Sequence, residues 1–162
     1  MVVEVKLAPP EFADWAGLLA LLHAAFAYQH DRIDPPSSLH ALNAELLAEK
    51  AMSEHLLIAV EGDALIACAF AKPQPGHLYI GKVAVSPHRQ GEGIGRLLMQ
   101  AAQELALQKG LAALELETRI ELHENHRTFA ALGFARIAEN AHAGYNRTTS
   151  IRMRKRLTAG AV

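Results

Sequence analysis

The sequence predicts an α/β (α+β) fold in which helices flank a mixed, mostly antiparallel central sheet. Three observations support this fold class. Short apolar or alternating runs typical of strands are interleaved with the three- and four-residue apolar periodicity typical of helices. Two of the apolar runs are separated only by Gly62-Asp63, which is typical of an antiparallel hairpin. A long amphipathic segment from Ile94 to Lys109 lies between two further apolar runs, which is typical of a parallel crossover.

The N-terminal part is expected to form one strand followed by two helices. Apolar and charged residues alternate over 3–7, which predicts a half-buried strand that Pro9-Pro10 end. Large apolar side chains recur at helical spacing over 12–26 and form one stripe. A second helix is expected after an N-cap at Ser37 or Ser38.

The remaining elements are mostly strands. Pro73 and Pro75 are expected to end the second strand of the hairpin, and Lys109-Gly110 to end the long helix. The predicted elements are strands over 56–61, 64–71 and 78–85, a helix over 94–109, a strand over 111–118, a helix around 126–132, and strands over 134–137 and 148–156. The predicted order is therefore strand, two helices, three strands, helix, strand, helix and two strands.

Length and composition set the class of protein. The 162 residues fit one domain, which we expect over residues 1–157 with a short tail at 158–162. Hydrophobic residues make up 51% and charged residues 20%, a balance typical of globular and not of disordered proteins. The formal net charge of −1 gives no overall attraction to nucleic acid or to an anionic membrane surface. We therefore expect neither as a partner.

Cysteine content and the N-terminus indicate a compartment. The single cysteine, Cys68, cannot form an internal disulfide, and its apolar neighbours favour a core role over that of a nucleophile. The first residues lack a basic region followed by an apolar core. The longest apolar run, 16–26, is too short to cross a bilayer. We expect a cytoplasmic protein.

The segment 83–96 carries the main functional signal. It passes from a strand through three glycines at alternate positions, Gly91, Gly93 and Gly95, into the long helix. Such glycines let the backbone approach a ligand and direct N–H groups to one place at the positive end of the helix dipole. Arg89 and Arg96 flank them and can add charge-assisted hydrogen bonds. The pattern predicts a phosphate site, and a tight strand–helix turn is the alternative.

Two other phosphate-binding loops do not fit. A P-loop ends in Gly-Lys-Ser/Thr, whereas Gly95 is followed by Arg96-Leu97. A dinucleotide fingerprint needs two residues between its second and third glycines, and this loop has one. The antiparallel hairpin upstream also differs from the βαβ unit in which that fingerprint occurs.

Gln90, Gly93 and Gly95 match the pattern Gln/Arg-x-x-Gly-x-Gly/Ala. With its flanking strand and Leu97-Leu98 helix, the segment resembles the pyrophosphate loop of the GCN5-related N-acetyltransferase (GNAT) superfamily. Leu132-Gly133-Phe134 is similar to a second landmark of that family, and the element order is similar over almost the whole chain. The resemblance implies an acyl-CoA N-acyltransferase-like fold whose sheet is splayed around a CoA site.

The resemblance also implies an activity. A transferase of this family moves the acetyl group of acetyl-CoA to a primary amine, here of a small molecule or peptide, by direct attack. The pantetheine arm lies along the strand before the loop, where a backbone amide stabilises the oxyanion. No metal is implied. The implied cofactor-binding residues are Val83, Ala84, Val85, Arg89, Gln90, Gly91, Glu92, Gly93, Ile94, Gly95 and Arg96.

Two helpers usual in the family are replaced in this chain. Phe129 occupies the position of the tyrosine that donates a proton, and Leu122 that of an asparagine. Asn125 lies one helical turn later and would reach the cofactor if its helix starts late. Because Phe129 lacks a hydroxyl, the alternative function is a regulatory module that binds acyl-CoA without chemistry.

The acceptor site is implied by two wall segments, 30–38 and 139–149. Arg32 and Asp34 in the first wall and His142 in the second are the predicted substrate-binding residues. Arg32 would suit an acceptor that carries a carboxylate. The alternative for Arg32 is a solvated loop side chain.

Three side chains are candidates for acid–base chemistry. Tyr145, in the second wall, has a hydroxyl that both donates and accepts, and a solvated loop tyrosine is the alternative. Glu117 shares one strand face with Glu115 and Arg119 by alternation. It would bind a cationic acceptor or take its proton, unless the face is a polar one paired with lysine or arginine. His126 is the third candidate, because histidine titrates near neutral pH.

Two further patterns were weighed. His123 and His126 lie three residues apart but lack a third ligand of suitable spacing, so no metal is expected. The basic run 152–156 is expected to be a solvated sheet edge, because the interleaved aromatics and basic total of a nucleic-acid module are missing. Such an edge would let two copies pair as a homodimer.

Overall fold

The computed structural model describes residues 2–158. Strands and α-helices follow the predicted order. The elements are β1 (Glu4–Leu7), α1 (Trp15–Phe26), η1 (Ala27–Gln29), η2 (Ser38–Ala41), α2 (Ala44–Ser53), β2 (His55–Glu61), β3 (Ala64–Gln74), β4 (His77–Val85), η3 (Pro87–Arg89), α3 (Ile94–Gln108), β5 (Ala113–Arg119), α4 (His123–Ala131), β6 (Ala135–Asn140) and β7 (Ser150–Arg156). The predicted tail at 158–162 lies, apart from Thr158, outside the described residues.

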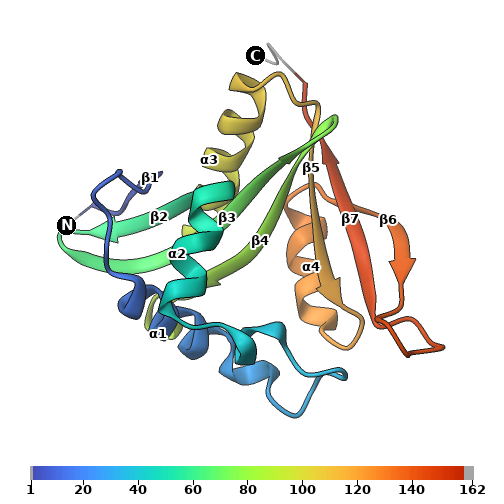
Figure 1. Ribbon diagram of the computed structural model, residues 1–162. Coiled ribbons are helices and arrows are strands. Elements are labelled where there is room, and N and C mark those ends of the chain that lie inside the picture. The colour runs from blue at the N-terminus through green and yellow to red at the C-terminus, as the bar shows by residue number, and fades with distance from the viewer. Residues whose placement is uncertain (1, 159–162) are drawn as a thin grey trace.

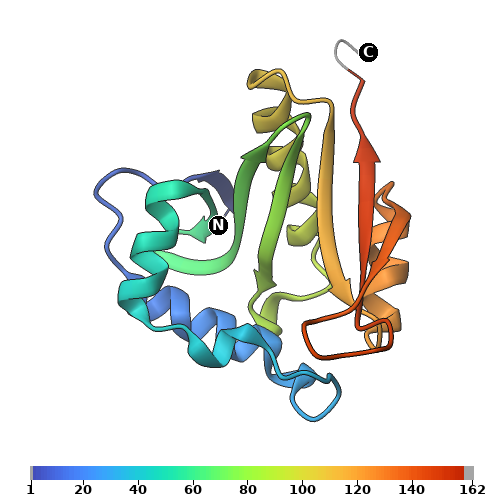
Figure 2. The ribbon, with the colours of Figure 1, turned by 45° about the vertical axis from the view of Figure 1, so that its right-hand side comes forward.

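The strands form one seven-stranded sheet in the order β1-β2-β3-β4-β5-β7-β6. Within the described residues only β4 and β5 are parallel neighbours, and α3 connects them. Their pairing covers only Leu78 with Leu114 and Tyr79 with Glu115. Beyond this pairing the two strands diverge, as the green and gold strands do at the lower end of Figure 2. The divergence leaves the second half of β4 without a strand partner on that side, and it confirms the predicted splayed, mostly antiparallel sheet.

Alternation along the central strands sorts the core into two layers. In β2, Leu57 packs in a cluster with α3, whereas its neighbour Leu56 packs in a cluster with α1 and α2. Phe129 of α4 packs against the α3 cluster. Helices α1 and α2 therefore cover one face of the sheet, and α3 and α4 cover the other (Figure 1). Cys68 is fully buried in the first of these layers, and burial raises the pKa of its thiol to about 12, in keeping with the predicted core role.

Three predicted boundaries were wrong. Strand β3 continues through Pro73 and pairs there with β4. Its pairing with β2 ends at Ala71, so the missing N–H of Pro73 costs no hydrogen bond to β2. The second helix splits in two: Ser37 caps only the short η2, and the side chain of Asn43 caps α2. Helix α4 begins at His123, earlier than expected.

The basic strand is not a sheet edge. Strand β7 lies between β5 and β6, so the edges are β1 and β6. Arg152 and Arg154 face Glu117 and Glu115 across the β5–β7 ladder. The expectation of a homodimer built on an exposed edge at Arg152 was therefore wrong in its geometry. Within residues 2–158, no helix has the length and apolar character needed to span a membrane.

Candidate functional site

The glycine-rich loop connects the end of β4 to the start of α3. Gly91 and Gly93 have φ values of 83° and 81°, left-handed conformations that a side chain would strain. Gly93 is also the N-cap of α3 and offers no side chain to the first N–H groups of this helix. These groups therefore remain available to a ligand at the positive end of the helix dipole.

A groove of about 570 Å³ opens beside this loop, and we call it the α3 groove. Its walls are the loop, the second half of β4, the end of α1 with η1, and α4. The predicted cofactor-binding residues that line it are Val83, Ala84, Val85, Arg89, Gln90, Gly91, Gly93, Ile94, Gly95 and Asn125. Glu92 and Arg96 lie outside this lining and are exposed.

Arg89 is already paired within the protein. Its guanidinium donates to both carboxylate oxygens of Glu61, at 3.1 and 3.0 Å, and to Glu92 at 3.0 Å. Hydrogen bonds to Glu61 and Glu92 raise the pKa of Arg89 above its ordinary value. The pair with Glu61 holds the loop against the end of β2, and together with Glu92 it largely neutralises the charge of Arg89 before any ligand binds.

A second groove, of about 480 Å³, follows β5 where this strand diverges from β4, and we call it the β5 groove. Its other walls include η2 and the segment before it. Five residues line both grooves, namely Phe26, Gln29, Val83, Asn125 and Phe129. We call these five residues the junction. A ligand in one groove would meet a ligand in the other at this place.

The junction includes the position where a tyrosine was expected. Phe129 places its ring there and packs edge-on against Phe134, with ring centroids 6.0 Å apart. Asn125 lines both grooves, although α4 begins at His123 and not late as that prediction supposed. Its contact with the cofactor stays a prediction.

Tyr28 is a residue that the sequence analysis missed. It lies in η1 and lines the α3 groove. Its hydroxyl accepts hydrogen bonds at 3.1 Å from the side-chain amides of Asn125 and Gln29, and donates to Oδ1 of Asn125 at 3.3 Å. In the sequence, Tyr28 closely follows the apolar residues of α1 and precedes the first wall segment, and this position could have suggested it. No local motif distinguishes it from a surface tyrosine.

Glu117 is the only carboxylate among the described residues that line the β5 groove. One of its oxygens accepts a 2.9 Å hydrogen bond from Arg152. Glu115, on the same strand face, is buried and bonded to both Arg152 and Arg154. Glu115 therefore fits the alternative reading, in which the carboxylates of this strand face only pair with arginines. Glu117 pairs with Arg152 but also lines the groove.

The first wall segment is bound to several parts of the protein. Tyr145 donates a 2.6 Å hydrogen bond to Asp34, and Arg147 pairs with the same carboxylate at 2.9 Å. These bonds hold the pKa of Asp34 below its ordinary value, that from Tyr145 contributing most. Neither Tyr145 nor Asp34 lines the two grooves. The hydrogen bond between Tyr145 and Asp34 therefore connects the two wall segments, and neither residue lies at the junction.

Three other predicted residues, Arg32, His126 and His142, differ in whether they line a groove. Arg32 lines the α3 groove, not the β5 groove, and pairs with Glu124 at 2.8 Å. His126 lines neither groove, and its Nε2 lies 2.9 Å from the backbone oxygen of Arg119. His142 lines the β5 groove, where its ring contacts Thr149. Only His142 therefore lies where an acceptor-binding residue was expected.

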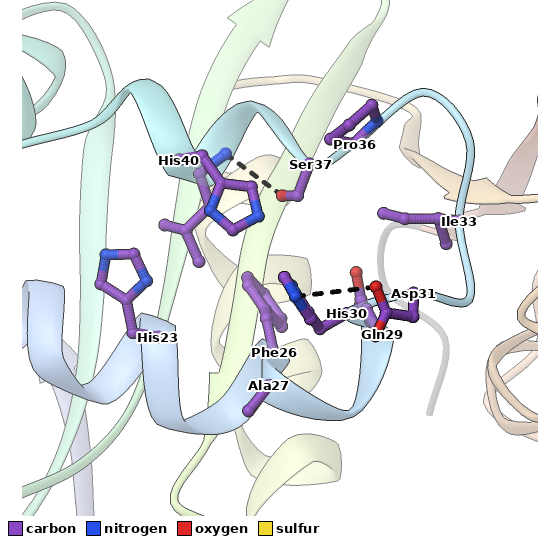
Figure 3. Close-up of a pocket in the computed structure, with 11 residues that line it drawn as sticks. His23, Phe26, Ala27, Gln29, His30, Asp31, Ile33, Pro36, Ser37 and His40 are labelled. Atoms are coloured by element: carbon purple, nitrogen blue, oxygen red, sulfur yellow. Dashed lines mark hydrogen bonds and ion pairs between the residues drawn. The ribbon is translucent and has the colours of Figure 1, made fainter.

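A third cavity, of about 470 Å³, lies between α1 and the segment leading into η2 (Figure 3). It shares five lining residues with the β5 groove, namely Phe26, Gln29, Ile33, Pro36 and Ser37. His23, His30 and His40 also line it. Among residues 2–158 no three histidine, cysteine or acidic side chains are grouped to hold a metal ion. The cavity lengthens the space beside the junction.

Comparisons with known structures agree with this arrangement. The chain superposes on a PaiA N-acetyltransferase from Thermoplasma acidophilum in complex with coenzyme A with a TM-score of 0.81, at 15% identity, over 97% of this chain and 100% of that one. It superposes on the ribosomal-protein-S18-alanine N-acetyltransferase of Escherichia coli with a TM-score of 0.73, at 15% identity, over 99% and 97%. For a GNAT family acetyltransferase from Elizabethkingia anophelis with acetyl-CoA bound, the TM-score is 0.72 at 18% identity, over 96% and 98%. At these identities the likeness shows the fold.

The sequence itself gives the family. Residues 15–134, from the first residue of α1 to Phe134, match the model of the acetyltransferase (GNAT) family. The chain belongs to this family, which confirms the resemblance of its glycine-rich loop. No curated protein matches the sequence significantly.

Proposed function

We propose that this protein is an N-acetyltransferase that transfers the acetyl group of acetyl-CoA to a primary amine. The observation that carries the proposal is the junction, where a groove beside the glycine-rich loop meets a groove beside the diverged strands. A binding module would need only the first groove. Two grooves that meet suit a reaction between two bound substrates.

The α3 groove suits the cofactor. The N–H groups at the start of α3 would bind the pyrophosphate, and exposed Arg96 would add a positive charge. The pantetheine arm would lie along Val83, Ala84 and Val85, where β4 has lost its parallel partner. The thioester would then reach the junction, and a backbone N–H near Val83 would stabilise the oxyanion.

Proton transfer is proposed for two side chains that line the grooves. The amine nitrogen attacks the thioester carbonyl carbon, and Glu117 takes the proton of the amine directly or through a water molecule. The carbon–sulfur bond then breaks, and the leaving thiolate takes a proton from the hydroxyl of Tyr28. Tyr28 replaces Tyr145 in this role, because the hydroxyl of Tyr145 is bonded to Asp34 away from both grooves.

Two measurements test the proposed function. Acetyl-CoA should raise the melting temperature, and a panel of primary amines should then release free CoA thiol in a colorimetric assay. Stabilisation without thiol release from any amine would favour the alternative, a regulatory module, which Phe129 at the usual tyrosine position keeps open. The absence of stabilisation by acetyl-CoA and by CoA would contradict both.

A further inference from the structure

The β5 groove contains more positive than negative charge. Lys50, Lys82 and Arg119 line it, together with one carboxylate, that of Glu117. Two of these groups are neutralised by partners: Lys50 lies 2.7 Å from Glu54, and Glu117 accepts from Arg152. The charges that remain without a direct counterion are therefore those of Lys82 and Arg119.

Neither of these two cations has a carboxylate within 4.0 Å in the described part of the chain. The ammonium of Lys82 donates to the hydroxyl of Ser38 at 3.0 Å. The guanidinium of Arg119 donates to the backbone oxygens of Pro35 and Pro36, at 2.6 and 3.1 Å. Neutral oxygens thus take the place of counterions, and both cations are held against the same wall of the groove.

Both side chains are also partly buried, which makes the lack of counterions costly. Burial and the nearby charges of Lys50 and Arg119 lower the pKa of Lys82. Burial likewise lowers the pKa of Arg119. Glu121 and Asp34 act on Arg119 from a distance, but Glu121 accepts from the backbone N–H of Asp34, and Asp34 is bonded to Tyr145. Glu121 and Asp34 therefore attract Arg119 from beyond 4.0 Å, and neither forms a direct ion pair with it in the described part of the chain.

The backbone at Lys82 is unusual as well. Lys82 has a φ of 52°, a left-handed conformation that is uncommon for a residue with a side chain. It lies where the β3–β4 register shifts, so Lys82 and Val83 together face Ala69. Such a bulge re-aims a side chain, and here it places Lys82 in the β5 groove next to Val83 of the junction.

We propose that Lys82 and Arg119 bind an oxyanion of the acceptor, a carboxylate or a phosphate, so that the enzyme selects amines that also carry a negative charge. The proposal rests on the proposed function for the reaction at the junction. It moves the anion site from Arg32, which Glu124 already neutralises, to two cations on neighbouring strands. An oxyanion there would supply the missing counterion for both groups.

The experiment compares acceptors in matched pairs that differ only in the anionic group. Amino acids are paired with their carboxamides, and O-phosphoethanolamine with ethanolamine. In a thiol-release assay we expect the KM of at least one anionic member to be about 10- to 100-fold lower than that of its neutral partner. The amino-acid arm and the phosphate arm distinguish the two oxyanions. Neutral partners that match or surpass the anionic ones in every pair would overturn the proposal.

Variants assign the preference to the residues. Lys82→Met should raise the KM for the anionic acceptor and leave the KM for its neutral partner within about threefold, removing most of the preference. Ser38→Ala removes the hydrogen bond to Lys82 but keeps the charge, so the preference should persist. Lys50→Met should have a smaller effect, because Glu54 already compensates that charge. Equal losses for both members of a pair in Lys82→Met would show a structural role and contradict the proposal.

A binding measurement makes the test independent of turnover. With CoA at saturation, N-acetylated amino acids or N-acetyl-O-phosphoethanolamine, the products expected of such acceptors, should raise the melting temperature more than their neutral analogues do. Lys82→Met should abolish this difference. If no amine releases thiol but the difference is present, the proposed function fails and the anion site stands. If thiol is released but neither measurement depends on the anion, the anion site fails alone.

Discussion

The side-chain amide of Asn125 donates a 3.1 Å hydrogen bond to the phenol oxygen of Tyr28, which lies 97 positions earlier in the chain. Gln29 donates to the same oxygen at 3.1 Å. The hydroxyl of Tyr28 in turn donates to Oδ1 of Asn125 at 3.3 Å, the longest of its three contacts. A hydroxyl hydrogen rotates to suit its acceptor, so for the proposed proton transfer that of Tyr28 would turn from Asn125 to the thiolate of CoA.

Removal of that hydroxyl should slow turnover. In Tyr28→Phe we expect kcat to fall by about 100-fold, because general acid catalysis contributes two to four orders of magnitude. The dissociation constant of acetyl-CoA, measured by isothermal titration calorimetry, should change little. Tyr145→Phe is the matched control and should stay within about threefold of wild type, because Tyr145 lines neither groove. The reverse ranking of the two variants would restore Tyr145 as the proton donor.

Phe129→Tyr should restore activity in the Tyr28→Phe background. The ring of Phe129 lines both grooves, so an added hydroxyl would reach the junction from α4 instead of η1. We expect the double variant to recover at least about tenfold in kcat over Tyr28→Phe. Single-turnover thiol release is the measurement. If kcat does not recover while circular dichroism shows an intact fold, proton donation to the thiolate is not the step that limits the Tyr28→Phe variant.

Gly93→Ala should weaken cofactor binding. A side chain at φ 81° costs roughly 1–2 kcal/mol and would disturb the N–H groups that open α3. Gly110→Ala is the matched control, because its φ of 71° imposes similar strain at the other end of α3. Both variants should lose similar free energy of unfolding in urea, but only Gly93→Ala should raise the dissociation constant of acetyl-CoA. Equal affinities in the two variants would argue for a turn that needs glycine only for its shape.

Glu115→Gln and Glu117→Gln should separate stability from chemistry. Glu115 is buried between two arginines, so its loss should lower the free energy of unfolding by about 3 kcal/mol. Glu117 is exposed, and its loss should cost less than about 1 kcal/mol. Glu117→Gln should instead lower kcat/KM by at least about 100-fold. Wild-type turnover in that variant would exclude Glu117 as the proton acceptor.

The contribution of Glu115 should also depend on pH. Burial would raise the pKa of Glu115, but hydrogen bonds from Arg152 and Arg154 outweigh burial and hold it below the ordinary value. A depressed folded-state pKa stabilises the protein above the unfolded-state pKa, and the stabilisation is lost as pH falls through the folded-state value. The stability difference between wild type and Glu115→Gln should therefore be constant from about pH 8 to 5 and shrink below about pH 4. A difference that grows as the pH falls below about 4 would contradict a depressed pKa of Glu115.

Several parts of the site followed from local sequence alone. The geometry of the loop from Gln90 to Gly95 depends mainly on local sequence, because left-handed glycines and the helix that follows them orient its N–H groups. Arg32, Asp34 and Tyr145 lie in the two predicted wall segments, but each is engaged in an internal pair. Their partners, Glu124 and Arg147 among them, come from other elements, and no spacing in the sequence reveals which charges will meet.

The sequence by itself determined the element order, the glycine-rich loop and the family, because periodicity, turn residues and the loop pattern are local properties of the chain. Only the tertiary structure decided which side chains share the junction. Tyr28, Lys82, Glu117 and Asn125 come from η1, β4, β5 and α4, and each lines one or both of the grooves that meet at the junction. The short β4–β5 pairing leaves room for these grooves. The same structure engaged Tyr145, Arg32 and Arg89 in internal pairs. A hydrogen bond or ion pair is formed by proximity in space, and proximity across many residues is a property of the packed sheet and helices.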